Sequence, residues 1–277
     1  MPLFINYNDD IVPAGTPLID TANRAFRYGD GLFETMRLAK GQLKFIDLHA
    51  DRLQRGMKAL KIDGYSQMDS YFIREKTDQL AIRNKIKHGR FRLTVYRDAA
   101  GLYTPSANKA GYCLELDPLE EPRYFLNERG LIMDIYNDIP KPVNLLSNIK
   151  TCNSLPYVMA SQFKKQNRLD DVFLLNQSGY LCEASSSNIF VLYQNVLYTP
   201  ALSEGCVEGI MRQVVMKLAQ EQGVQVVEAQ INPEILYQAD EVFLTNAIKG
   251  IQWVMGYGVK RYFNQLSKQL IDELNLL

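Results

Sequence analysis

The segment Tyr180-Leu181-Cys182-Glu183-Ala184-Ser185-Ser186-Ser187-Asn188 places a single carboxylate shortly before a run of small hydroxyl side chains. Earlier in the chain, Asn148-Ile149-Lys150-Thr151-Cys152-Asn153 places a single amine between an extended stretch and a stretch with helical spacing. These two segments decide how the rest of the sequence is interpreted, because they carry its most distinctive pair of reactive groups.

The composition is that of a globular protein with room for two domains. The chain has 277 residues, of which 47% are hydrophobic and 22% are charged, and its formal net charge is zero. That balance favours neither nucleic acid nor an anionic membrane surface as a partner. No run approaches the roughly 20 apolar residues of a membrane span, and the N-terminal residues lack the basic and apolar regions of a signal peptide. We therefore expect a cytoplasmic protein.

Cysteine and histidine are too scattered to predict a metal site. The four cysteines lie at positions 113, 152, 182 and 206 without a C-x-x-C pair, and the chain has two histidines. We therefore expect no metal, and free thiols in a reducing compartment.

Hydrophobic periodicity predicts strands interleaved with helices in both halves of the chain. The stretch 117–122 is polar and twice broken by proline, so we expect an N-terminal domain at 1–118 and a C-terminal domain at 119–277. A loop containing Pro140 and Pro142 is expected to follow the strand at 131–136. The other expected strands are 3–6, 33–38, 42–46, 90–97, 111–116, 172–175, 188–193, 196–198 and 241–245. A hairpin turn is expected at Lys40-Gly41, between the strands at 33–38 and 42–46. The expected helices are 45–60, 70–85, 156–167, one that opens at 205–212, and 266–276.

Two local patterns could bind an anion. Arg90, Arg92 and Arg97 make the strand at 90–97 polar, which suits either an anion site or the exposed face of an antiparallel sheet. The helix that opens after Gly209 offers free backbone N–H groups to a phosphate, although many helices begin after glycine. The sequence leaves the alternatives open in both cases.

An amine that forms a Schiff base and a carboxylate that holds a ring nitrogen protonated are the two groups that pyridoxal phosphate chemistry requires. Lys150 and Glu183 are candidates for these roles. Taken alone, Lys150 could be an ordinary surface lysine, Glu183 a turn residue and Arg52 a solvated helix arginine.

Six motifs that follow one another in order resemble the class IV (fold type IV) pyridoxal-phosphate enzymes. This family includes D-amino acid aminotransferase, branched-chain aminotransferase and aminodeoxychorismate lyase. The resemblance extends from Arg24 to about Val254, and it implies an α+β fold with a smaller N-terminal domain, a larger C-terminal domain and the cofactor between them. The motifs are 24–35, His49 to Leu53, Lys150, Glu183 to Asn188, Gly209 to Arg212 and Glu241 to Ala247.

The resemblance also implies a role for individual residues. Lys150 would attach the cofactor and act as the general base, and Glu183 would contact the pyridine nitrogen. Arg97 would bind a substrate carboxylate, and Phe33 would contact the substrate. Glu34 is either a group that supports the site or an outward-facing strand residue. The other residues implied to bind pyridoxal phosphate are Arg52, Ser187, Ile210, Met211, Thr245 and Asn246.

Two features favour aminodeoxychorismate lyase within the family. The stretch Thr245 to Ile248 looks like the Asn-Ala-Leu stretch of these lyases, and Arg97 stands where an arginine for the substrate carboxylate is expected. Other features favour the alternative, an amino acid aminotransferase of the D-amino acid or branched-chain type. The Glu183 segment looks like that of the D-amino acid enzymes, although Phe33 replaces their tyrosine. A non-catalytic binding protein is a more distant alternative. The resemblance further implies a homodimer and a small-molecule amino substrate.

Overall fold

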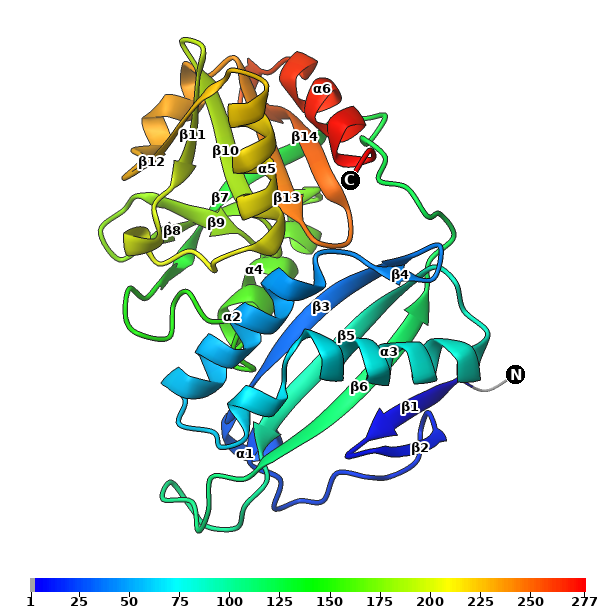
Figure 1. Cartoon of the computed structure of the whole chain (residues 1–277). Helices are drawn as coiled ribbons and strands as arrows, with labels where there is room; N and C mark the ends of the chain where they lie inside the picture. The colour runs from blue at the N-terminus through cyan, green and yellow to red at the C-terminus, as the bar shows by residue number, and fades with distance from the viewer. Residues whose placement is uncertain (1–2) are drawn as a thin grey trace. The chain divides into compact units, whose positions relative to one another are not determined.

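The structure, a computed structural model, describes residues 3–277 (Figure 1). The chain divides into two compact units. Unit 1 comprises the residues up to Arg123 together with Ile149–Asn153, and unit 2 comprises Tyr124–Asn148 and Ser154–Leu277. We expected the chain to divide at 118/119. Glu121 and Arg123 stay with unit 1, because their carbonyl groups accept hydrogen bonds from Arg37 at 2.7 Å.

Unit 1 is a six-stranded sheet covered on one face by two helices. The strand order is β2-β1-β6-β5-β3-β4, and the central pairs are antiparallel. The strands are β1 (Phe4–Tyr7), β2 (Asp10–Pro13), β3 (Gly31–Ala39), β4 (Gln42–Leu43), β5 (Gly89–Arg97) and β6 (Ala110–Pro118). The helices are α1 (Arg24–Tyr28), α2 (Ile46–Ala59) and α3 (Ser70–Asn84), with a 3-10 turn at Tyr65–Gln67.

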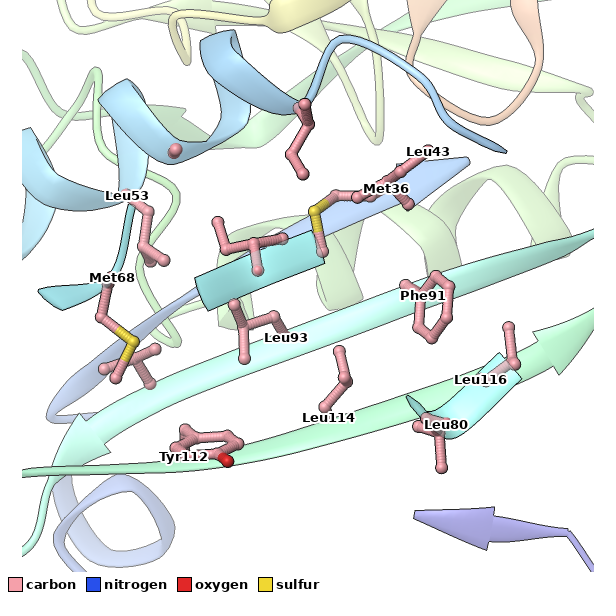
Figure 2. Close-up of a cluster of buried hydrophobic side chains, with 14 of the residues drawn as sticks. Met36, Leu43, Leu53, Met68, Leu80, Phe91, Leu93, Tyr112, Leu114 and Leu116 are labelled. Carbon is pink, nitrogen blue, oxygen red and sulfur yellow. The ribbon is translucent and has the colours of Figure 1, made fainter. Parts of the chain in front are cut away.

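The core of unit 1 lies between the sheet and helices α2 and α3. Figure 2 shows Met36, Phe91, Leu93 and Leu114 from the strands beside Leu53 from α2. These side chains are at most 2% exposed, so the sheet face and the apolar stripes of the helices bury each other.

The hairpin from β3 to β4 turns at Lys40 and Gly41. Both residues have a positive φ, 52° and 76°, which a two-residue turn between twisted strands requires. The expected turn at Lys40-Gly41 is therefore confirmed.

Unit 2 is a nine-stranded sheet of mixed direction with helices packed on it. The strand order is β12-β11-β10-β13-β14-β7-β8-β9, with β15 paired to β14. Helix α5 packs on β12 and β13, α6 on β13 and β14, and α4 on β7 and β8. The strands are β7 (Leu131–Lys141), β8 (Asp171–Asn176), β9 (Leu181–Ala184), β10 (Asn188–Tyr193), β11 (Val196–Pro200), β12 (Gln225–Ala229), β13 (Glu241–Asn246), β14 (Gly250–Tyr257) and β15 (Lys260–Arg261). The helices are α4 (Leu155–Gln166), α5 (Ile210–Glu221) and α6 (Gln265–Leu274), with 3-10 turns at Leu202–Glu204 and Pro233–Tyr237.

The α+β fold class is confirmed, and most of the expected elements lie within two residues of their observed positions. The expected loop at Pro140 is wrong, because β7 continues to Lys141. The strand tolerates the proline because its pairing with β8 is irregular between Tyr136 and Lys141, where no ladder hydrogen bond is required. The elements that we did not expect are β2, α1, β9, β12, β14 and β15.

Candidate active site

Lys150 is held in unit 1 by pairing of its own short segment with β3. The Phe33 N–H donates to the Lys150 carbonyl at 2.9 Å, and the Cys152 N–H donates to the Gly31 carbonyl at 2.9 Å. These two bonds enclose an antiparallel bridge between Leu32 and Thr151. Lys150 therefore lies in a strand-like segment, Ile149–Asn153, that pairs with β3. The residues that flank this segment in the sequence on both sides belong to unit 2.

The side chains of Lys150 and Arg92 both lie against the aromatic ring of Phe33. The Lys150 Nζ is 4.6 Å from the centre of the Phe33 ring, and the guanidinium carbon of Arg92 is 3.7 Å from the same centre. Arg92 is only partly exposed, and burial lowers its pKa. Its ion-pair partner, Glu115, is 4.0 Å away. An amine, an aromatic ring and a weakly paired cation thus lie together in unit 1.

Arg52 forms a buried cluster with Glu34 and His49. The Arg52 Nε donates to Glu34 Oε1 at 2.8 Å, and an Arg52 NH2 hydrogen donates to Oε2 at 2.5 Å. The His49 Nδ1 lies 2.6 Å from the same Oε2. Glu34 is 1% exposed, so it is not an outward-facing strand residue; it supports Arg52.

The charges in this cluster follow from burial and contact. Burial raises the pKa of Glu34, but the charge of Arg52 and the bond to His49 outweigh it and set the pKa at about 2. Burial lowers the pKa of His49 despite the neighbouring carboxylate. We therefore assign a neutral imidazole at pH 7 that donates its Nδ1–H to Glu34. Within residues 3–277, the buried Nε2 of His49 has no hydrogen-bond partner.

Arg97 is fully engaged with protein acceptors inside unit 1. It donates to the carboxylate of Asp30 at 3.0 and 3.3 Å, to the carbonyls of Lys61 and Leu60 at 2.9 and 2.6 Å, and to the side-chain oxygen of Asn108. These bonds account for all five N–H groups of a guanidinium. Arg97 also borders a cavity of about 300 Å³ in this unit. Its contacts hold the end of β5 in place, and they leave the expected substrate-binding role without a spare donor.

Glu183 lies on β9 in unit 2, where three donors surround its carboxylate. Oε1 accepts a hydrogen bond from the Tyr157 hydroxyl at 2.6 Å and a short one from the Lys141 ammonium. Oε2 accepts one bond from the Val207 N–H at 2.9 Å. Glu183 is 3% exposed and Lys141 is 7% exposed, so this is a buried ion pair.

The N-terminus of α5 lies beside Asn188, the first residue of β10. Gly209 precedes the helix, and a Cβ at this position would lie 1.9 Å from the Asn188 side-chain oxygen. Only glycine fits here without moving Asn188, whose Nδ2 donates to the Val207 carbonyl at 2.8 Å. Because glycine has no side chain to cap the helix, the first N–H groups of α5, those of Ile210 and Met211 among them, have no side-chain cap.

Thr245, Asn246 and Ser187 lie next to this helix start. Thr245 pairs with Asn188 across the β10–β13 ladder. The Asn246 Nδ2 donates to Ser187 Oγ at 2.9 Å, and its Oδ1 accepts the N–H groups of Ile248 and Lys249 at 3.1 and 2.8 Å. The Thr245 Oγ1 is buried and has no partner within residues 3–277.

These residues fit pyridoxal phosphate. Within unit 2, an uncapped helix start and an unpartnered buried hydroxyl suit a phosphate, and a buried carboxylate suits a protonated ring nitrogen. Sequence reasoning missed Lys141 and Tyr157, although a lysine between two prolines at a strand end was a signal.

Within the described part of the chain, residues 3–277, no helix is both long and apolar enough to cross a membrane. No group of three or more histidine, cysteine or acidic side chains within those residues is arranged to hold a metal ion.

The chain is similar in sequence to known proteins over most of its length. It is 30% identical over 87% of its length to a putative branched-chain-amino-acid aminotransferase of Methanocaldococcus jannaschii, covering 83% of that protein. A D-alanine aminotransferase of Listeria innocua is 30% identical over 86% of this chain and 82% of its own length. An aminodeoxychorismate lyase of Bacillus subtilis is 27% identical over 82% of this chain and 77% of its own length.

Two further comparisons concern the fold and the family. A crystal structure of the branched-chain aminotransferase of Thermoproteus uzoniensis superimposes with a TM-score of 0.89, 21% identity and coverage of 99% of this chain and 93% of that one. The family described as amino-transferase class IV matches residues 31–256. The chain therefore belongs to the class IV aminotransferase family, a family of pyridoxal-phosphate-dependent enzymes.

Proposed function

We propose that this enzyme is an aminodeoxychorismate lyase, which converts 4-amino-4-deoxychorismate into p-aminobenzoate and pyruvate. The observation that carries the proposal is the cluster of Lys150, Phe33 and Arg92 in unit 1. The substrate has an unsaturated, carboxylated six-membered ring with an amine on it, and this ring becomes aromatic in the product. An aromatic side chain suits that ring, and a weakly paired guanidinium suits a carboxylate, which is costly to bury alone.

Arg92 takes the role that we expected of Arg97. The donors of Arg97 are used within unit 1, whereas Arg92 has one distant carboxylate partner and lies on the ring next to Lys150. We propose that Arg92 binds a carboxylate of the substrate.

The chain's own groups would hold the cofactor and move one proton. We propose that Glu183 meets the ring nitrogen, and that Arg52, Thr245 and the N-terminus of α5 bind the phosphate. Bound pyridoxal phosphate supplies a sink for the electrons left when a proton is removed. The Lys150 amine would take that proton from the carbon bearing the substrate amine. The neighbouring C–O bond would then break with loss of the enolpyruvate anion, which leaves the aromatic ring of p-aminobenzoate. The proton taken by Lys150, or one from water, would protonate the enolpyruvate to give pyruvate.

The second candidate is an amino acid aminotransferase of the D-amino acid or branched-chain type. The two relatives at 30% identity carry such names. The contacts of Asn246 with Ile248 and Lys249 also favour it, because they account for Asn246 by turn formation rather than by a lyase-specific role. The remaining expectations, a homodimer in the cytoplasm that contributes to folate synthesis, go with the lyase proposal.

One experiment separates the two candidates. The purified protein, loaded with pyridoxal phosphate, is followed by absorbance while D- and L-amino acids are added without a keto acid. Pyruvate release from aminodeoxychorismate is measured in parallel. Rapid pyruvate release with slow or no spectral change supports the lyase. Rapid conversion by one amino acid, without pyruvate release, would overturn it in favour of the aminotransferase.

Arg92→Met and Arg90→Met form a matched pair for the substrate site. Both arginines lie on β5, but Arg90 is 40% exposed and pairs with Asp117 at 3.4 Å. If Arg92 binds a substrate carboxylate, Arg92→Met raises KM for aminodeoxychorismate by about 10-fold or more, which corresponds to the loss of one charge-assisted hydrogen bond. Arg90→Met is expected to leave KM unchanged, and equal KM values for the two variants would contradict the assignment.

A further inference from the structure

A second buried lysine contacts the carboxylate that the proposed function assigns to the cofactor ring. Lys141 ends β7, and its ammonium donates to Glu183 Oε1. The same ammonium lies 3.4 Å from the Ser147 carbonyl and 5.4 Å from the centre of the Tyr157 ring. Lys141 is 7% exposed and Glu183 is 3% exposed, so the two side chains form an ion pair that is buried from solvent and held by protein partners.

Tyr157 completes the environment of Glu183. Its hydroxyl donates to the same Oε1 that Lys141 contacts. Burial and the Glu183 charge both raise the pKa of Tyr157, so the phenol keeps its proton and remains a donor. Two donors therefore converge on one oxygen, while the other oxygen accepts, among residues 3–277, the Val207 N–H.

Lys141 cannot share the role of Lys150. The ring nitrogen and the aldehyde-bearing carbon lie at opposite ends of the pyridine ring of pyridoxal phosphate. An amine bonded to the carboxylate at the nitrogen end is therefore remote from the carbon at which a lysine would attach. Lys141 is a positioning residue that acts through Glu183.

We propose that Lys141, together with Tyr157, makes Glu183 a weaker base, so that a proton shared between Glu183 and the ring nitrogen of bound pyridoxal phosphate stays on the ring. The inference rests on the proposed contact between Glu183 and that nitrogen. A protonated ring nitrogen is what allows the ring to accept electrons from the substrate. Lys141 would thus control the strength of the electron sink without touching cofactor or substrate.

The size of the effect follows from the contact. One opposite charge within a few ångströms changes the proton affinity of a carboxylate by a factor of about 10 to 1,000. Loss of Lys141 should therefore lower the ratio of protonated to unprotonated ring nitrogen by about 10- to 1,000-fold. Loss of the Tyr157 hydroxyl, which is neutral, should move the ratio in the same direction by a smaller factor.

The test is nitrogen NMR of the holoenzyme with the ring nitrogen of pyridoxal phosphate isotopically labelled. Lys141→Met should move the resonance toward that of an unprotonated pyridine, and Lys141→Arg, which keeps the charge, should restore it. Lys165→Met is the matched control, because Lys165 is an exposed lysine on α4 in the same unit. It should leave the resonance where it is in the unsubstituted enzyme.

The outcomes separate the inference from the proposed function. If the unsubstituted protein binds no pyridoxal phosphate, or if Glu183→Gln leaves the resonance unchanged, the proposed function of Glu183 fails. If Glu183→Gln moves the resonance but Lys141→Met does not, the inference is overturned while the function of Glu183 stands. If Lys141→Met does not fold, Tyr157→Phe decides: a shift toward unprotonated pyridine supports the inference, and no shift overturns it.

Discussion

In each unit of this protein a buried carboxylate pairs with a buried cation, Glu34 with Arg52 and Glu183 with Lys141, and the two pairs are built differently. In unit 1, Glu34 uses both oxygens on Arg52, and His49 adds a third bond. In unit 2, Lys141 and Tyr157 converge on one oxygen of Glu183, while the other accepts a single backbone N–H.

The difference indicates that one buried carboxylate stabilises the fold and that the other is available to a bound group. The two-point contact of Glu34 fixes the plane of a guanidinium, and removing either partner would leave an unpaired charge in a closed site. The one-sided arrangement at Glu183 leaves the second oxygen with capacity for another donor, because a carboxylate oxygen can accept more than one bond. We therefore expect substitutions at Glu34 and Arg52 to affect stability most, and substitutions around Glu183 to affect the bound cofactor most.

The largest expected effect is that of Arg52→Ala. It leaves Glu34 buried without its cation, so the free energy of unfolding should fall by about 3–5 kcal/mol. Urea denaturation measures this. Arg55→Ala is the control, because Arg55 lies on the same helix but is 48% exposed and pairs with exposed Asp51, a contact worth less than about 1 kcal/mol. Similar losses of stability in the two variants would show that the buried Glu34–Arg52 pair contributes no more than an exposed pair. The proposed contrast between Glu34 and Glu183 would then fail.

The second-largest expected effect is a loss of stability at acid pH, when Glu34 takes up a proton. The pKa of Glu34 is lowered from 4.5 to about 2, so its contribution is complete above pH 4.5 and is lost as the pH falls toward 2. The shift corresponds to about 3 kcal/mol. Glu34→Gln should be less stable at pH 7, and its stability should change less between pH 4.5 and 2. Parallel pH curves for the two proteins would contradict the assignment.

Tyr157→Phe tests the one-sided arrangement at Glu183. Removing a hydrogen bond to a charged group should reduce the free energy of unfolding by about 1.5–3 kcal/mol. Tyr193→Phe is the control in the same unit, since its hydroxyl accepts one exposed bond from Gln194 at 3.1 Å. Thermal or urea unfolding of both variants gives the comparison, and an equally small effect would mean that Tyr157 does not stabilise Glu183.

Gly209→Ala should have the smallest effect, about 1–3 kcal/mol from overpacking. The new Cβ displaces Asn188, which holds the Val207 carbonyl, and Val207 in turn donates to Glu183. The double variant Asn188→Ala/Gly209→Ala removes the clash, so it should be no less stable than Asn188→Ala alone. Additive losses in urea denaturation would show that steric conflict with Asn188 is not the cause.

The sequence predicted well what depends on local pattern. The Lys40-Gly41 turn, the helices and the β10 and β13 strands follow from hydrophobic spacing and turn chemistry. The role of Glu34 stayed open because alternation places Glu34 and Met36 on one face of β3 but does not show which face the helices cover. Lys141 was missed because proline usually ends a strand, whereas the irregular pairing of β7 accommodates it.

The partners of Arg97 could not have been inferred from sequence. They are the carbonyls of the adjacent residues Leu60 and Lys61 and the side chains of Asp30 and Asn108, which lie in three separate parts of the sequence of unit 1. Only the folded sheet brings these acceptors to the end of β5. A family resemblance assigns a residue type to a position, but it does not show which of its donors are already used.

The segment Ile149–Asn153 has a consequence for biosynthesis. It completes the edge contact of β3 in unit 1, yet the ribosome makes it after residues 124–148 of unit 2. A nascent chain can form most of unit 1 early, but Lys150 takes its place only after a long stretch of other sequence has emerged. Contacts of such high sequence separation are slow to form. The Lys150 amine is therefore expected to be among the last groups of unit 1 to be positioned.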